Sequence, residues 1–279
     1  MLTRLTAALL LLAAPAAALP QGAPIEPLRW EVPYSYPDFI GTPWSVAVGD
    51  HGAFTIVGRA GPEAGLDLHA GGSAQPLWME RFGTRSYVIR VAAADHAPVA
   101  AAFTLMDVDP DPASSLLEAR LRLFELEGSI SESWSQAFAT GSSWYWDAGG
   151  VALSDDGAVV VGWWDLFDLG VTRVVALRRD GSLISQSDLP MKNSGYKTAG
   201  LLLSDDGMRA LVSENTVIRL LDIPTGAVLA SHSTQKGIPL TSIAFSGDGR
   251  RAVAASWDEL VVLELSLIHI SEPTRPRLV

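Results

Sequence analysis

Hydrophobic positions along the chain recur in short runs separated by turn-forming residues. Residues 200–232 read GLLLSDDGMRALVSENTVIRLLDIPTGAVLASH, and residues 242–264 begin the same phrase again as SIAFSGDGRRAVAASWDELVVLE. Each copy has an apolar run, an Asp/Gly turn, a second run and a third run, and the first copy adds a Gly turn and a fourth run. Such runs, bounded by tight turns, are typical of antiparallel β-strands. The pattern therefore predicts an all-β protein built from repeated four-stranded antiparallel sheets.

Two series of turns recur along the chain and keep in step. The first series joins the first and second strand of each repeat: Asp50-His51-Gly52, Asp95-His96-Ala97, Asp155-Asp156-Gly157, Asp205-Asp206-Gly207 and Gly247-Asp248-Gly249. The second joins the third and fourth strand: Gly72-Ser73, Gly128-Ser129, Gly181-Ser182 and Gly226-Ala227. Gly adopts positive φ freely and Asp tolerates it, which explains their recurrence. The two series predict about five repeats over 44–264, with the fifth one truncated.

The repeats resemble a known superfamily. Residues 244–265, AFSGDGRRAVAASWDELVVLEL, are similar to the strand–turn–strand phrase of WD-repeat and quinoprotein-like propellers. The resemblance covers most of 44–264 and implies a β-propeller whose blades are four-stranded antiparallel sheets. It implies no particular activity. The strict WD repeat is absent, because no Gly-His pair opens the blades and Trp257-Asp258 comes before a third strand instead of closing it. This departure favours a divergent, exported propeller.

The two ends of the chain are expected to lie outside the repeats. Residues 1–18 combine Arg4, a short apolar run and a small-residue cleavage site, which predicts a secretory signal and a periplasmic or secreted protein. Residues 19–43 are Pro-rich, and their IEPLRWEV run is expected to add an outer strand to the last blade. Residues 265–275, LSLIHISEPTR, resemble the translated transposon-end adapter of sequencing libraries. We therefore expect 265–279 to be an artefact that replaces further blades.

Composition and charge narrow the function classes. The 279 residues include 20 Lys and Arg against 31 Asp and Glu, giving a formal net charge of −11 and a sequence pI near 4.8. Binding to nucleic acid or to anionic membranes depends on neutralising phosphates with positive charge, so neither partner is expected, nor is membrane insertion after signal cleavage. The chain has no Cys, which excludes disulfides and Cys-ligated metals. No cofactor is predicted.

An aromatic and acidic patch is predicted on the blade end where second strands lead into third strands. Its expected members belong to the third repeat: Trp144, Tyr145, Trp146, Asp147, Trp163, Trp164, Asp165, Phe167 and Asp168. Flat rings edged by carboxylates suit a carbohydrate or a protein partner. The alternative is that some of these aromatics pack between blades. Strand alternation directs Trp163 and Trp164 to opposite faces in either case.

Other site chemistry is weakly indicated. Asp107, Asp109, Asp111 and Glu118 copy the oxygen-ligand spacing of an EF-hand loop, although Pro112 stands where that loop needs Gly. A solvated acidic loop is the alternative. The histidines show no ligand spacing, and His51 and His96 occupy equivalent turns, where exposure is expected. No metalloprotease, serine-hydrolase or phosphate-loop motif is present.

These observations predict an exported, non-catalytic propeller that binds a ligand or acts as a scaffold through the loops around blade three. The alternative is a quinoprotein-like or lactonase-like propeller enzyme whose catalytic residues lie partly in missing blades. The first strands of the repeats are apolar where such an enzyme needs polar side chains, which favours binding. A structural module associated with the cell envelope is a third hypothesis.

Overall fold

The computed structural model describes residues 42–61, 64–71, 73, 75–83, 86–107, 117–127, 130–139, 149–191, 198–214, 216–233, 240–246, 251–256 and 260–264. These residues form β-strands and two single-turn 3₁₀ helices, η1 (Asp50–Gly52) and η2 (Phe167–Leu169). None of the helices in this described part is long and apolar enough to cross a membrane. The strands are β1 (Thr42–Gly49), β2 (Phe54–Ala60), β3 (Ala64–Ala70), β4 (Pro76–Gly83), β5 (Ser86–Ala93), β6 (Val99–Asp107), β7 (Leu117–Glu125), β8 (Ser131–Ala139), β9 (Gly149–Leu153), β10 (Val159–Leu166), β11 (Val171–Arg178), β12 (Leu183–Pro190), β13 (Thr198–Leu203), β14 (Arg209–Glu214), β15 (Val217–Asp222), β16 (Val228–Ser233), β17 (Leu240–Phe245), β18 (Arg251–Ser256) and β19 (Leu260–Glu264).

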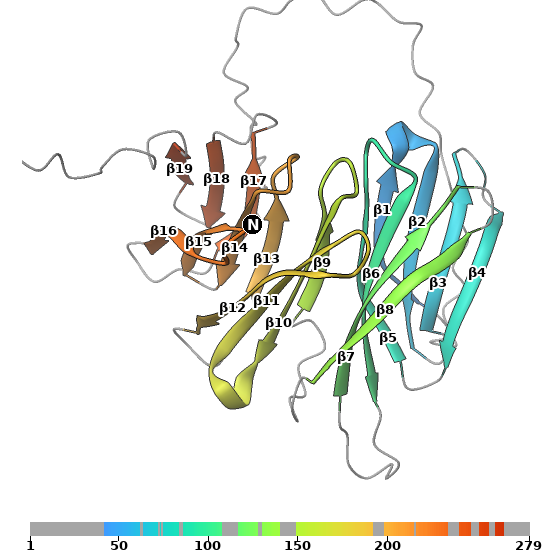
Figure 1. Ribbon diagram of the computed structural model, residues 1–279, viewed down its shortest axis with the longest axis horizontal. Helices are drawn as coiled ribbons and strands as arrows, with labels where there is room; N and C mark the ends of the chain where they lie inside the picture. Colours follow the sequence, from blue (N-terminus) through green and yellow to red (C-terminus); the bar gives the residue numbers. More distant parts are fainter. Residues whose placement is uncertain are drawn as a thin grey trace, which may run out of the picture. The chain divides into compact units, whose positions relative to one another are not determined.

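Consecutive strands pair antiparallel in groups of four, as the sequence predicts (Figure 1). We call these groups blades: blade one is β1–β4, blade two β5–β8, blade three β9–β12, blade four β13–β16, and blade five the three described strands β17–β19. A single residue pair, Ala60 with Tyr87, joins blades one and two into one eight-stranded sheet. The prediction of an all-β fold made of four-stranded antiparallel units is confirmed.

The predicted turns lie between the expected strands, and their side chains explain the Asp-Asp-Gly repeats. In the turn from β9 to β10, Asp156 accepts hydrogen bonds from the Ser154 hydroxyl (2.7 Å) and from the Ala158 backbone N–H (2.9 Å). Gly157 follows with φ of 67°, a conformation that Gly adopts without strain. The turn from β13 to β14 repeats the same bonds around Asp206. The second Asp of each motif is therefore a turn-forming residue.

Each inner blade packs against two neighbours, and alternate residues of one strand enter alternate cores. In β10, Val160 and Trp164 lie in the core shared with blade two, whereas Val161 and Trp163 lie in the core shared with blade four. Both faces of β10 are covered, so the strand is apolar almost throughout. Each fully buried aliphatic side chain contributes about 1.5–3 kcal/mol relative to exposure. Interfaces between blades therefore supply most of the hydrophobic stabilisation.

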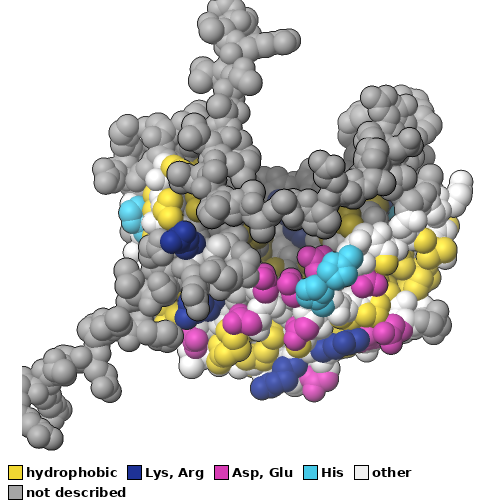
Figure 2. All heavy atoms as spheres, turned by 90° about the horizontal axis from the view of Figure 1, so that it is seen from above, with side chains coloured by type: hydrophobic (Ala, Val, Ile, Leu, Met, Phe, Trp, Pro, Cys, Tyr) yellow, Lys and Arg dark blue, Asp and Glu magenta, His cyan; other side chains and the backbone are white. Residues whose placement is uncertain are grey.

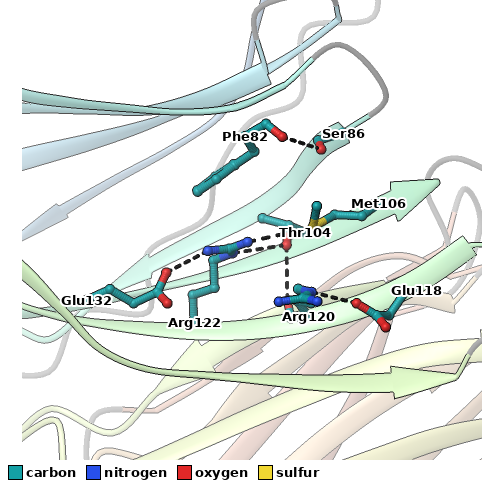
Figure 3. A network of polar contacts seen from close by, with 8 residues as sticks. All are labelled: Phe82, Ser86, Thr104, Met106, Glu118, Arg120, Arg122 and Glu132. Atoms are coloured by element: carbon teal, nitrogen blue, oxygen red, sulfur yellow. Dashed lines mark hydrogen bonds and ion pairs between the residues drawn. The ribbon is translucent and has the colours of Figure 1, made fainter. Parts of the chain in front are cut away.

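Charged side chains also connect neighbouring blades. Arg122 on β7 donates hydrogen bonds to Glu132 (2.6 Å) and to the Thr104 hydroxyl (3.5 Å), and its guanidinium lies 4.1 Å from the ring centroid of Phe82 on β4 (Figure 3). Arg122 is nearly buried. A cation over an aromatic face, partly removed from water, is stabilising. This contact ties blade two to the outermost strand of blade one.

Candidate functional site

The loop end of blade three carries the described part of the predicted patch. We define the loop end as the sheet end where β10 passes into β11, through η2. Residue pairing places the start of β9 and the end of β12 at this same end, since Trp164 pairs with Gly149 and Val171 pairs with Pro190. The predicted grouping of these segments at one sheet end thus agrees with the strand pairing.

The η2 turn forms an exposed tip at the loop end. Phe167 is half-buried, Asp168 is exposed, and Leu169 keeps 67% of its surface in solvent. Gly170 ends the turn with φ of 64°, and its carbonyl accepts a hydrogen bond from the Met191 backbone N–H at 2.8 Å. The tip therefore presents an aliphatic side chain and a carboxylate on a fixed turn.

A buried polar network lies directly beneath this tip. Asp165, at the end of β10, accepts a hydrogen bond from the Thr172 hydroxyl at 2.5 Å. Glu214 and Arg219 of blade four form an ion pair, and Arg219 also donates to the carbonyl of Pro190 at 2.8 Å. Burial raises the pKa of Glu214, while the hydrogen bond from Arg219 opposes this shift. These contacts join blades three and four below the tip.

Three residues of the predicted patch are not at the surface. Trp163 and Trp164 retain only 3% and 1% of their exposure, and Asp165 is likewise buried. The two Trp side chains do point to opposite faces, but a neighbouring blade covers each face. Trp164 packs against Phe103 and Phe138, with ring centroids 6.2 and 5.0 Å away. The expectation that Trp163, Trp164 and Asp165 join an exposed patch is corrected: they belong to cores between blades.

Several predicted residues lie outside the described part of the chain. These are Trp144, Tyr145, Trp146 and Asp147 of the patch, Asp109 and Asp111 of the acidic loop, and the terminal segments 1–41 and 265–279. Among the other candidate metal ligands, Asp107 ends β6 and Glu118 accepts a hydrogen bond from Arg120 Nε at 2.6 Å (Figure 3). Glu118 is thus already engaged in an ion pair.

The opposite end of the blades holds a cluster that the sequence pattern did not reveal. We call it the turn-end cluster: His51, His96 and Asp155, from the first turns of blades one, two and three. His51 Nε2 lies 3.1 Å from His96 Nδ1, and His96 Nε2 lies 4.0 Å from a carboxylate oxygen of Asp155. Burial raises the pKa of Asp155, and the neighbouring carboxylates Asp205 and Asp95 raise it further. Figure 2 shows histidine side chains beside acidic ones on one face of the molecule.

Backbone hydrogen bonds between successive turns hold this cluster together. The Asp50 N–H donates to the Ala94 carbonyl at 2.9 Å, and the His96 N–H donates to the Asp155 carbonyl at 2.8 Å. Residues 45 positions apart have no local spacing signal. The available clue was that His51 and His96 hold the same position in consecutive turns.

Comparisons with known proteins bear on the fold. No protein-family profile and no curated protein sequence matches the chain. The chain is similar to many solved structures, among them two at 12% sequence identity. Kuenenia stuttgartiensis hydrazine synthase matches with a TM-score of 0.57 over 80% of this chain and 71% of that chain. The Myceliophteria thermophila Cps50 (Swd1) β-propeller domain matches with a TM-score of 0.54 over 86% and 68%.

The fold is a β-propeller. At 12% identity the likeness shows the fold alone. In this propeller the two candidate regions lie at opposite ends of the blades, since β10 begins at the first turn of blade three and ends at the η2 tip. The loop end offers an apolar and acidic contact surface, and the turn-end cluster offers imidazole nitrogens among carboxylates.

Proposed function

We propose that this protein is an exported, non-catalytic β-propeller that binds a carbohydrate or protein ligand at the loop end of blade three. The observation that supports this most is the η2 tip, where the exposed Leu169 and Asp168 stand on a hydrogen-bonded turn. Trp and Tyr are the side chains that most often dominate recognition surfaces, and the sequence places Trp144, Tyr145 and Trp146 just before β9, which starts at this same end of the blade.

Rigidity beneath the tip favours binding. The buried Asp165–Thr172 hydrogen bond fixes the strands that carry the turn. Arg219, held by Glu214 within blade four, donates to the Pro190 carbonyl and so braces blade four against blade three. A surface already ordered in the free protein loses less conformational entropy when a ligand binds. The sequence places further Trp and Tyr side chains just before β9, and we propose that they complete the contact surface.

Binding is tested with a glycan array, followed by titration calorimetry of each glycan that binds. Leu169→Ala and Trp144→Ala should each weaken binding about tenfold or more, because anchoring side chains at a contact centre dominate affinity. The matched control is Leu77→Ala on β4, an equally exposed leucine on another blade, which should leave affinity unchanged.

A protein ligand is tested with a photoreactive amino acid placed at position 168 and, as control, at position 77. Crosslinking of one defined partner from position 168 alone would favour a protein ligand over a glycan. If the array shows no ligand and both positions crosslink alike, the proposal is wrong.

A further inference from the structure

The turn-end cluster differs from the other first turns of the blades because it brings two imidazole rings together. His51 lies in η1 with φ of 52° and ψ of 31°, a left-handed conformation that is uncommon for residues other than Gly. His96 comes from the equivalent turn of blade two, between β5 and β6. Both side chains are exposed to solvent. The inter-turn hydrogen bonds of Asp50 and His96 fix the two backbones relative to each other.

The geometry of the two rings suits shared coordination of one ion. His51 Nε2 and His96 Nδ1 face each other at 3.1 Å, and the ring planes meet at 63°. Two nitrogens that each lie about 2.0–2.1 Å from one metal ion are roughly 2.8–3.4 Å apart for bond angles between about 90° and 109°. The observed separation falls inside this range. In the free protein this contact is a hydrogen bond, so the donating nitrogen must first pass its proton to the other nitrogen of its ring and both rings must turn toward the ion.

The surroundings favour a cation. His96 Nε2, the nitrogen directed away from His51, lies 4.0 Å from Asp155. This distance is too long for a hydrogen bond, so the carboxylate acts on the imidazole through its charge. Asp95 and Asp205 also act on Asp155, so negative charge gathers around the carboxylate next to His96. A divalent ion would be attracted by this negative charge.

We propose that His51 and His96 form a two-histidine site for a late first-row transition-metal ion, with Cu²⁺ preferred over Zn²⁺. Imidazole nitrogen suits both ions, and Cu²⁺ stands highest in the general order of divalent affinities. Within the described ranges, no group of three or more His, Asp or Glu side chains is arranged to hold a metal. Solvent accordingly completes the coordination shell, and the negative charge of Asp155 beside His96 attracts the ion. This site is independent of the loop end.

The test is titration of the full protein, purified without a histidine tag, with CuCl₂ and separately with ZnCl₂. Calorimetry should give one Cu²⁺ per chain at this site, and electron paramagnetic resonance should show two nitrogen ligands. His51→Asn and His96→Ala should each weaken Cu²⁺ binding at least tenfold, and Asp155→Asn should weaken it less. Asn is chosen at position 51 because it tolerates positive φ. His232→Ala, on β16 of blade four, is the control and should bind like the wild type.

Circular dichroism establishes that each variant is folded before it is titrated. If a variant fails to fold, the spectrum of the wild type decides, because two bound nitrogens support the pair and one or none contradicts it. The proposal is overturned if the wild type binds no Cu²⁺ at millimolar concentration. It is also overturned if His51→Asn and His96→Ala bind Cu²⁺ as tightly as His232→Ala does.

Discussion

The buried ion pair between Glu214 and Arg219 provides the sharpest test of how the blades are held together. Their side chains keep only 8% and 7% of their exposure, and Arg219 also donates to the carbonyl of Pro190. Replacing Arg219 with Met retains much of the side-chain volume but leaves a carboxylate buried without its cation. Removing one partner of a buried pair costs about 3–5 kcal/mol. For a chain of this size, about 2–4 °C per kcal/mol gives a fall in Tm of roughly 6–20 °C.

The loss of stability in Arg219→Met should depend on pH, and the pKa of Glu214 gives the direction of this dependence. Burial already raises the pKa of Glu214 above its ordinary value of 4.5, and Arg219 opposes that shift. Without Arg219 the pKa rises further, so the folded variant holds its proton to higher pH than the wild type does. A carboxyl whose pKa is higher in the folded than in the unfolded chain stabilises the fold at pH values below its unfolded pKa. This stabilisation is lost as the pH rises through the folded pKa. The deficit of Arg219→Met should therefore be smallest near about pH 4.5 and grow toward neutral pH.

Urea unfolding at several pH values measures this effect. The control is Arg173→Met, which breaks the bidentate pair with Asp188, whose side chains keep 24% and 39% of their exposure. That surface pair should contribute under about 1 kcal/mol. The double variant Glu214→Gln/Arg219→Met removes both charges and should recover much of the loss. Equal costs for Arg219→Met and Arg173→Met, or a deficit that does not change with pH, would refute the reasoning.

Two further predictions concern the interface between blades two and three. Leu121 is fully buried against Gly162 of β10, so Leu121→Ala leaves a cavity there. Chemical denaturation should show a free energy of unfolding that is lower by about 2–5 kcal/mol. A loss under about 1 kcal/mol would contradict this packing. Glu125→Gln removes the hydrogen bonds from Arg179 that hold the Glu125 pKa below 4.5. A lowered pKa contributes stability that is present above the unfolded pKa and is lost as the pH falls through the folded pKa. The unfolding midpoints of wild type and variant should therefore converge as the pH falls below 4.5, and a constant difference would contradict the assignment.

The repeating turns made the blade pattern readable from sequence. Two turn series in step placed the first-to-second and third-to-fourth strand connections of the first four blades between the right strands. A tight turn needs local residues such as Asp156 and Gly157 whatever surrounds it. The period-2 alternation of Trp163 and Trp164 was also determined locally, by the geometry of the strand.

The solvent exposure of the patch side chains could not be predicted from the sequence. An aromatic pair beside acidic residues is typical of a surface patch, but a blade covered on both faces buries Trp163 and Trp164 in two different cores. Phe167 and Asp168 of the η2 tip were part of the predicted patch, whereas the exposed Leu169 was not. The tip reaches solvent because it lies beyond the end of the pairing between β10 and β11.

Local residue patterns were sufficient to predict the strands, the tight turns and the four-stranded repeat, since each depends on residues that are neighbours in the chain. Tertiary structure alone decided which faces are covered and which distant side chains meet. His51 and His96 are unremarkable turn residues in the sequence, and they become a pair only because adjacent blades bring equivalent turns within hydrogen-bonding distance. Contacts across blade interfaces depend on how the repeats stack, and no local pattern encodes them.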